Sequence, residues 1–241
     1  NNHPANKSRF CDIGVCSPIV QSLKKYKGSM EVVFAAIGAA RSVSSQPAAA
    51  RQLVTAGLCE LCLELLDNCM EHIDVVEQVL GLLANIVGAD AEARHLLVDY
   101  GFCEKLLQCI QYGESSDTSM LRKEFVSFSL SRHSKNQQYV RKYSDSSSIV
   151  VLFCQIVASL ARTPATSYYL SNIGAFGIVI EAIKQFPKVE SVALSAAVAT
   201  ACLTHDNPIC AVLFVDGGCY SHFITMIELH SRSKQVVESA M

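Results

Sequence analysis

Apolar residues along this chain of 241 residues recur at fixed distances from glycine. A large apolar residue stands four positions before each of five glycines, in the pairs Phe10/Gly14, Leu53/Gly57, Leu97/Gly101, Leu170/Gly174 and Leu213/Gly217. Six positions after the same glycines stand Val20, Leu63, Leu107, Ile180 and Phe223. Nine positions after them stand Leu23, Leu66, Ile110, Ile183 and Met226. Such offsets are typical of the buried stripe of an amphipathic helix, so each glycine is predicted to join two helices.

A further apolar stretch lies upstream of four of the glycines and predicts a longer helix there. These stretches cover residues 30–43, 74–87, 149–161 and 189–203. Polar turns follow, three of them with proline, which cannot extend a preceding helix. The predicted repeat is therefore a short helix ending at glycine, a medium helix, a loop and a longer third helix. Glycine at the first junction permits a left-handed backbone that a side chain would penalise.

The spacing of the glycines indicates a repeat array with one irregularity. Successive glycines are 43, 44, 73 and 43 residues apart. Three of these gaps fall within the period of about 40–47 residues of HEAT and armadillo arrays. The long gap contains an irregular segment at 112–148. We favour a degenerate repeat that lost a helix, with a loop inserted into an ordinary repeat as the alternative.

The stretch LLANIVGADAEARHLLVDYGFCEKLLQCI, residues 82–110, resembles the armadillo repeat family. Within it, Leu83-Ala84-Asn85-Ile86 is similar to the family's aliphatic-x-Asn-Leu signature. HEAT repeats are the near alternative, but the glycine junction and the three-helix repeat favour armadillo. The resemblance runs from about residue 5 to 241. It implies an all-α fold, a right-handed α-solenoid of armadillo-like three-helix repeats that forms one domain over residues 1–241.

The resemblance also implies a binding groove lined by the third helices, where an extended peptide or a helix of a protein partner would lie. It places Asn85 in that groove, where its amide could bond the partner's backbone. The other expected groove residues are Gly81, Gln78, Ser42, Arg41, Ser129, Gln155 and Ser159. The chain departs from the nuclear-import adaptors, whose grooves resemble a ladder of Trp and Asn. It contains no Trp, which argues against recognition of basic localisation signals.

A cluster of cysteines suggests metal or thiol chemistry at first sight. Cys59-x-x-Cys62, followed by Cys69 and His72, has the residue types of a zinc site or a redox pair. If residues 58–68 are helical, however, Cys59 and Cys69 are separated by roughly 15 Å along the helix axis. A tetrahedral zinc ion needs all its sulfur ligands at about 2.3 Å. We therefore expect no metal ion and no cofactor.

Cysteine also recurs once per repeat, which is the behaviour of a packing residue. Two positions after their glycines stand Cys16, Cys59, Cys103 and Cys219. A catalytic thiol has no reason to recur in this way, whereas a small, buried side chain does. Because phosphate-loop, hydrolase and metalloprotease motifs are also missing from the sequence, we expect the chain not to be an enzyme.

Composition narrows the functional classes further. Half of the residues are apolar, and 20 Lys and Arg residues face 22 Asp and Glu residues, so no net positive charge favours nucleic acid. The apolar stretches are shorter than the roughly 20 residues that cross a bilayer, so no membrane span is expected. Eleven cysteines in a long aliphatic chain indicate reduced thiols and a cytoplasmic location, with the nucleus as a second compartment. The chain begins without Met, so we expect a fragment of a longer protein.

The irregular segment 112–148 contains eleven serines. Two interpretations of this segment are open. It is a solvated segment, or it is a regulated docking loop in which added phosphate pairs with arginine. The residues of that loop would be Ser115, Ser116, Arg122, Arg132 and Arg141.

For the whole chain we expect a non-enzymatic protein–protein interaction scaffold. The alternative is a regulatory or dimerising arm of a larger enzyme, such as a kinase or ubiquitin ligase.

Overall fold

The computed structural model describes residues 4–69, 72–110, 146–216 and 219–240. Within these ranges every regular element is an α-helix and none is a strand. The chain divides into two compact units, residues 1–105 and 106–241, and each is described here by itself.

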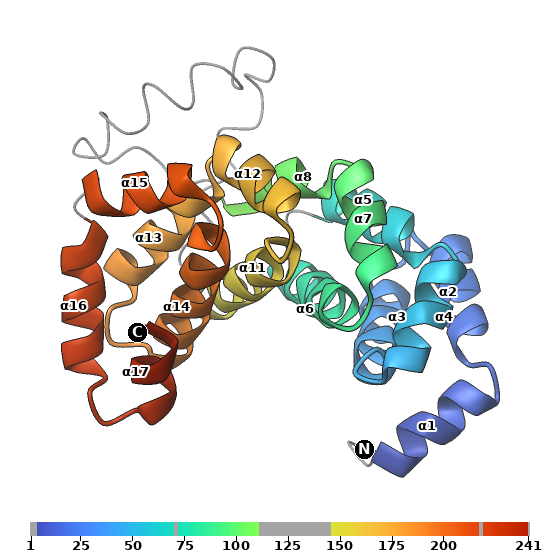
Figure 1. The fold of residues 1–241 in the computed structure, drawn as a ribbon. Helices are drawn as coiled ribbons and strands as arrows, with labels where there is room; N and C mark the ends of the chain where they lie inside the picture. The colour runs from blue at the N-terminus through green and yellow to red at the C-terminus, as the bar shows by residue number, and fades with distance from the viewer. Residues whose placement is uncertain (1–3, 70–71, 111–145, 217–218, 241) are drawn as a thin grey trace. The chain divides into compact units, whose positions relative to one another are not determined.

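The first unit is built of short, medium and long helices in the predicted order (Figure 1). Its helices are α1 (Pro4–Asp12), α2 (Cys16–Lys25), α3 (Met30–Val43), α4 (Pro47–Thr55), α5 (Leu58–Asn68), α6 (Ile73–Ala89) and α7 (Ala91–Asp99). The long helices α3 and α6 lie side by side, while α2 and α5 pack against each other. A further helix, α8 (Phe102–Ile110), begins in this unit and crosses its boundary.

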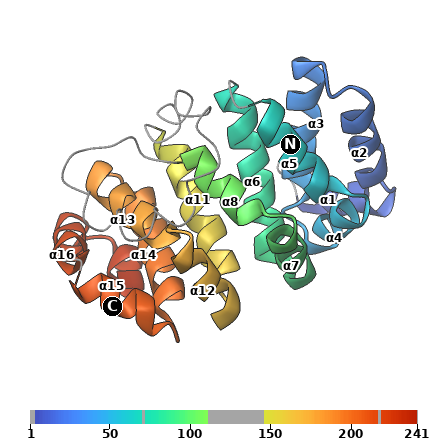
Figure 2. The ribbon, with the colours of Figure 1, turned by 90° about the horizontal axis from the view of Figure 1, so that it is seen from above.

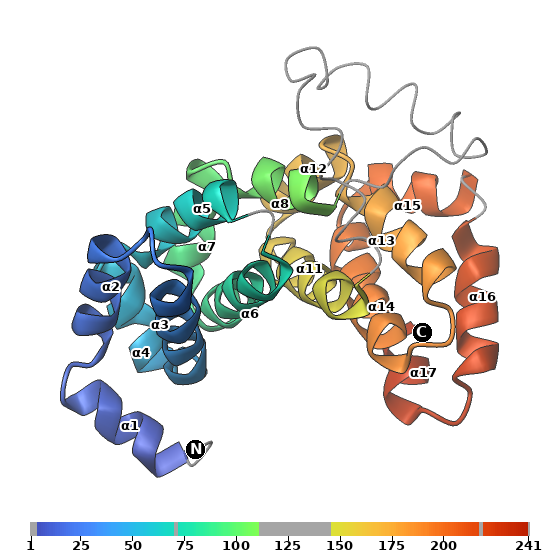
Figure 3. The same cartoon turned by 180° about the vertical axis from the view of Figure 1, so that it is seen from behind.

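The second unit repeats the same arrangement. Its helices are α11 (Ser147–Leu160), α12 (Pro164–Asn172), α13 (Ala175–Gln185), α14 (Glu190–Thr204), α15 (Pro208–Asp216), α16 (Cys219–Leu229) and α17 (Lys234–Ala240). Helix α14 packs against α11 on one side and α17 on the other, as the view from behind shows (Figure 3). Helix α13 packs against α16, and the two lie side by side when seen from above (Figure 2). Long helices thus form one layer and medium helices a second.

The long helices coincide with the four apolar stretches of the sequence. Helices α3, α6, α11 and α14 begin and end within two residues of the predicted bounds. Their apolar side chains form the core, for example Val76 and Leu83 on α6 and Phe153 on α11, each with no exposed surface. On α14 half of the buried residues are alanines, such as Ala196 and Ala199. Small side chains let neighbouring helices approach closely.

The glycines that end the short helices adopt a left-handed backbone. Gly14, Gly57, Gly101 and Gly174 have φ angles of +76°, +86°, +74° and +94°. In this region an L side chain crowds the neighbouring carbonyl, which glycine avoids. The short and medium helices therefore meet at a sharp turn. The fifth predicted junction, Gly217, lies outside the described residues.

Two other expectations concern the middle of the chain and its membrane behaviour. Of the irregular segment 112–148, only the residues from 146 onward are described, where Ser146 caps α11. The choice between a lost helix and an inserted loop thus falls outside the described residues.

Among the described helices, no single one is long and apolar enough to cross a membrane. One pair, α15 and α16, meets both criteria together, but it is bent by 77°.

The junction glycines provide a direct test of the repeat geometry. Gly174 and Gly177 lie three residues apart, and a Cβ on either would meet no atom within 4 Å. Only Gly174 has positive φ. We expect Gly174→Ala to lower the free energy of unfolding by about 1–2 kcal/mol. In contrast, Gly177→Ala in helix α13 should raise it by about 0.5–1 kcal/mol. Urea denaturation measures the free energy of unfolding of both variants. If the two substitutions changed it in the same direction, the left-handed turn at Gly174 would be contradicted.

Candidate functional site

The predicted groove residues of the first unit form a cluster between the long helices α3 and α6. Arg41, near the end of α3, reaches across to α6, and its Nη1 donates a hydrogen bond of 3.2 Å to Oε1 of Gln78. The guanidinium group lies directly over Gly81, so that a Cβ at this position would collide with the Nε and Cζ atoms of Arg41. Gly81 is buried. It therefore contributes room for the arginine rather than exposed surface.

Asn85 also takes part in this cluster, through bonds within the fold. Its Nδ2 donates to the carbonyl oxygen of Arg41 at 3.1 Å and to Oγ of Ser44 at 3.0 Å. Ser44 is buried, and its hydroxyl donates to the same Arg41 carbonyl at 2.9 Å. The carbonyls at a helix C-terminus have no partner within the helix. The amide of Asn85 thus caps α3 from the next repeat, and both of its N–H donors are used there.

The candidate residues of the second unit are more accessible. On α11, Gln155 is exposed and Ser159 is half-buried. Each aligns with exposed or half-buried residues on α14 at the matching position of the next repeat. We define the α11–α14 strip as the residues that follow one face of these two helices: Ser148, Gln155, Ser159, Ser191, Val198 and Cys202. None of these side chains is charged. The strip offers one amide, three hydroxyls, a thiol and a valine.

The remaining site predictions have different outcomes. Ser42 is exposed at the end of α3, beside the cluster around Arg41. Ser129 and the residues of the predicted docking loop lie outside the described residues: Ser115, Ser116, Arg122, Arg132 and Arg141. Their roles stay predictions.

The cysteines pack in the core. Cys16, Cys59, Cys103 and Cys219 are each at most 5% exposed, and every cysteine that the structure describes is a free thiol. Burial raises the pKa of Cys59 to about 11 and that of Cys103 to about 12. Burial likewise raises the pKa of Cys154 to about 12. Because the thiolate is the reactive form, such thiols are poor nucleophiles.

The cysteine cluster that suggested zinc is dispersed in the structure. Cys62 is buried within α5, while Cys69 caps the end of that helix. The thiol of Cys69 contacts the sulfur of Met30 at 3.8 Å. Across the described parts of the chain, no three His, Cys, Asp or Glu side chains gather in a way that could hold a metal ion.

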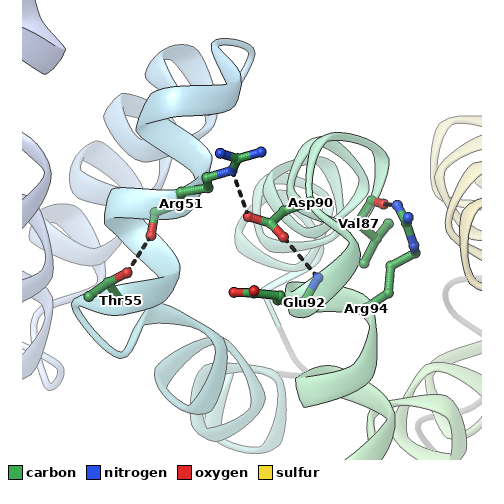
Figure 4. A network of polar contacts seen from close by, with 6 residues as sticks. All are labelled: Arg51, Thr55, Val87, Asp90, Glu92 and Arg94. Carbon is green, nitrogen blue, oxygen red and sulfur yellow. Dashed lines mark hydrogen bonds and ion pairs between the residues drawn. The ribbon is translucent and has the colours of Figure 1, made fainter.

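Two polar contacts between repeats were missed by the sequence interpretation. The first surrounds Asp90, which precedes α7 and is 8% exposed. One carboxylate oxygen accepts the Glu92 N–H at 2.8 Å, and the other pairs with Nε of Arg51 on α4 at 3.2 Å (Figure 4). Nearby, Arg94 donates to the carbonyl oxygen of Val87 at 2.7 Å. The sequence allows Asp90 to be recognised as a helix cap, because it stands directly before a helix. It does not show that Asp90 pairs with Arg51 on α4.

The second contact surrounds Asn207, which precedes α15 and is 1% exposed. Its Nδ2 donates to the hydroxyls of Ser167 and Ser171 on α12, both at 2.9 Å. Its Oδ1 accepts the Cys210 N–H at 3.3 Å. Asp90 and Asn207 thus occupy the same place in their repeats. Each caps a short helix and bonds the short helix of the preceding repeat.

Comparison with known proteins finds solved structures with a similar architecture. No family model matches the chain, and no curated protein matches it significantly. Among solved structures, a designed armadillo repeat protein in complex with the peptide (KR)4 is similar, with a TM-score of 0.69, 16% identity and coverage of 98% of this chain and 85% of that chain. An engineered protein is 19% identical, with a TM-score of 0.69 and coverage of 99% and 85%.

A third similar structure is a computationally designed armadillo repeat protein for modular peptide recognition. Its TM-score is 0.69 at 16% identity, and the match covers 97% of this chain and 85% of that chain. These likenesses show the fold. The chain is an all-α solenoid of armadillo-like repeats, which confirms the resemblance found in the sequence at the level of fold.

The role of Asn85 in joining repeats is testable. Asn85→Ala removes two hydrogen bonds between α6 and the end of α3. We expect the free energy of unfolding to fall by about 1–2 kcal/mol. The control, Ser42→Ala, changes an exposed side chain on the same end of α3 and should cost less than about 0.5 kcal/mol. Urea denaturation measures the free energy of unfolding of both variants. If neither value differed from that of the parent chain, Asn85 would not have the capping role.

Proposed function

Because the fold is that of armadillo-like repeats, we propose that this chain is a non-enzymatic interaction scaffold that binds an extended peptide segment of a protein partner. The designed armadillo proteins support the proposal at a general level, since one was solved with the peptide (KR)4 and another was designed for peptide recognition. At 16% identity, no residue role passes from them to this chain. The binding residues must be argued from its own surface.

The observation that carries the proposal is the accessibility of the α11–α14 strip. Opposite Gln155, α11 buries Phe153 and Val157 completely, so one face of the helix packs in the core and the other face is open to a partner. Gln155 is exposed and makes no hydrogen bond to any residue that the structure describes. Its amide can both donate and accept. An extended peptide has backbone N–H and C=O groups that need such partners.

The chemistry of the strip favours a neutral peptide. Val198, 38% exposed, offers an apolar contact on α14 in the row that Gln155 begins on α11. The strip contains no carboxylate to pair with basic side chains, and the chain contains no Trp. We propose recognition of a peptide with uncharged side chains, in contrast to the (KR)4 peptide of the designed protein.

The first unit has a smaller part in this proposal. The side chains of Arg41 and Gln78 already bond each other, and the amide of Asn85 already bonds the end of α3. A partner that displaced these bonds would gain little, because each new bond would replace an old one. Ser42 remains exposed at the edge of the cluster. We therefore place the main contacts on the second unit.

The test begins with a random peptide library selected against the whole chain of 241 residues. For a selected peptide, we expect Gln155→Ala to weaken binding by about five- to tenfold, the effect of losing one net hydrogen bond. The control, Gln185→Ala, changes an exposed glutamine at the end of the medium helix α13 and should leave affinity unchanged. Isothermal titration calorimetry measures both dissociation constants.

Two results would overturn the proposal. One is a set of selected peptides whose affinity does not respond to Gln155→Ala. The other is a failure of the library to yield any peptide that binds the folded chain.

A further inference from the structure

Helix α16 carries apolar residues on its outer surface, at the edge of the second unit (Figure 1). We define the α16 stripe as Tyr220, Ile224 and Ile227, which are three and four residues apart and so share one face of the helix. Tyr220 is 53% and Ile224 is 52% exposed, while Ile227 is half-buried. On α15, which packs against α16, Val212 and Val215 are exposed as well. The last repeat thus exposes large apolar side chains on two consecutive helices.

Other repeats carry polar residues or glycine at the positions of the α16 stripe, which lie three, seven and ten residues after the junction glycine. The matching residues are Ser17, Gln21 and Lys24 on α2, Glu60, Glu64 and Asp67 on α5, and Gly177, Glu181 and Lys184 on α13. Val215, two residues before its glycine, likewise stands where the other short helices have exposed polar residues: Asp12, Thr55, Asp99 and Asn172. The apolar surface is therefore a property of the last repeat and not of the fold.

The polar stripes of the other medium helices need no partner outside the fold. On α5, Glu64 pairs with Lys27 at 2.6 Å. On α13, Glu181 pairs with Lys184 at 2.7 Å. The exposed apolar side chains of the α16 stripe differ, because they gain free energy when a second surface removes them from water. This difference indicates a docking surface on α16.

The charges on α16 favour one partner over others. The helix contains no Lys or Arg, and Glu228 is its single acidic residue. Anionic lipid surfaces and acidic proteins are attracted by basic side chains, which α16 does not offer. In a two-fold dimer, by contrast, each helix meets its own copy, so a charge near the axis meets a like charge. The acidic stripe of α5 would repel its copy, whereas the uncharged α16 stripe is compatible with itself.

We propose that two copies of this chain form a two-fold symmetric dimer through the α16 stripe. The two α16 helices run antiparallel, with Ile224 nearest the axis and Tyr220 facing the partner's Ile227. A contact built on one or two helices of each copy is small, so the dimer is reversible and depends on concentration. The α16 stripe belongs to a medium helix and the α11–α14 strip to long helices. Dimer formation therefore does not rest on peptide binding.

Sedimentation velocity of the whole chain at increasing concentration tests the proposal. We expect the parent chain to shift from one copy to two. Ile224→Glu introduces the residue that α5 and α13 carry at this position. It should raise the dissociation constant of the dimer by at least about 100-fold, because two like charges meet near the axis. The control, Leu96→Glu, changes a side chain on α7 that is 39% exposed and should leave the dimer unchanged. Circular dichroism checks that both variants keep the helical content of the parent.

A mixing experiment tests the two-fold geometry. Ile224→Lys alone should be monomeric, as Ile224→Glu is, because each variant places its own charge on both sides of the axis. An equimolar mixture of the two variants should form a dimer with one copy of each, since opposite charges then face each other. A contact between two different surfaces would not restore association in this way.

Several results would overturn the proposal. They are a parent chain that stays monomeric at every concentration, an Ile224→Glu variant that dimerises like the parent, growth beyond two copies, or a mixture of the two charged variants that stays monomeric. Flotation with phosphatidylcholine vesicles tests the other occupant. If the parent chain stayed monomeric but floated with vesicles, and Ile224→Glu did not, the stripe would bind a lipid surface instead.

Discussion

The structure depends on joint burial of the long third helices. Each carries apolar residues on more than one side, and helices of its own repeat and of the neighbouring repeats cover them together. Helix α14 shows this most clearly, since it lies between α11 and α17 and buries Val192, Ala196 and Leu203 almost completely. A repeat that contacts only its neighbours gains its stability from those interfaces. The proposed binding face is the side of these helices that the packing contacts leave exposed.

Polar residues make these interfaces specific. Asp90 and Asn207 precede short helices in two different repeats, and both reach the short helix of the preceding repeat. Buried polar groups must be bonded, so a repeat stacked out of register would leave them unpaired. Asn85 does the same between long helices. Apolar packing thus provides the stabilisation, while these bonds fix how one repeat meets the next.

The parts that sequence predicted well are those set by local periodicity. Helix ends and junction glycines follow from the order of residues within one repeat, so α3 and α14 lie where the apolar stretches indicated. Bonds between repeats could not be predicted in this way, because the partners lie about one period apart. The bond from Asn85 to Arg41 spans 44 residues.

The most direct measurement of joint burial is native-state hydrogen exchange of α14, compared between the full chain and a chain ending at His205. The account predicts that α14 amides exchange much faster in the shortened chain, because α15 and α17 no longer cover that helix. The amides of α3, which lie in the other unit, should keep their protection. Unchanged protection of α14 would contradict the account, since the helix would then be stable without the repeat that follows it.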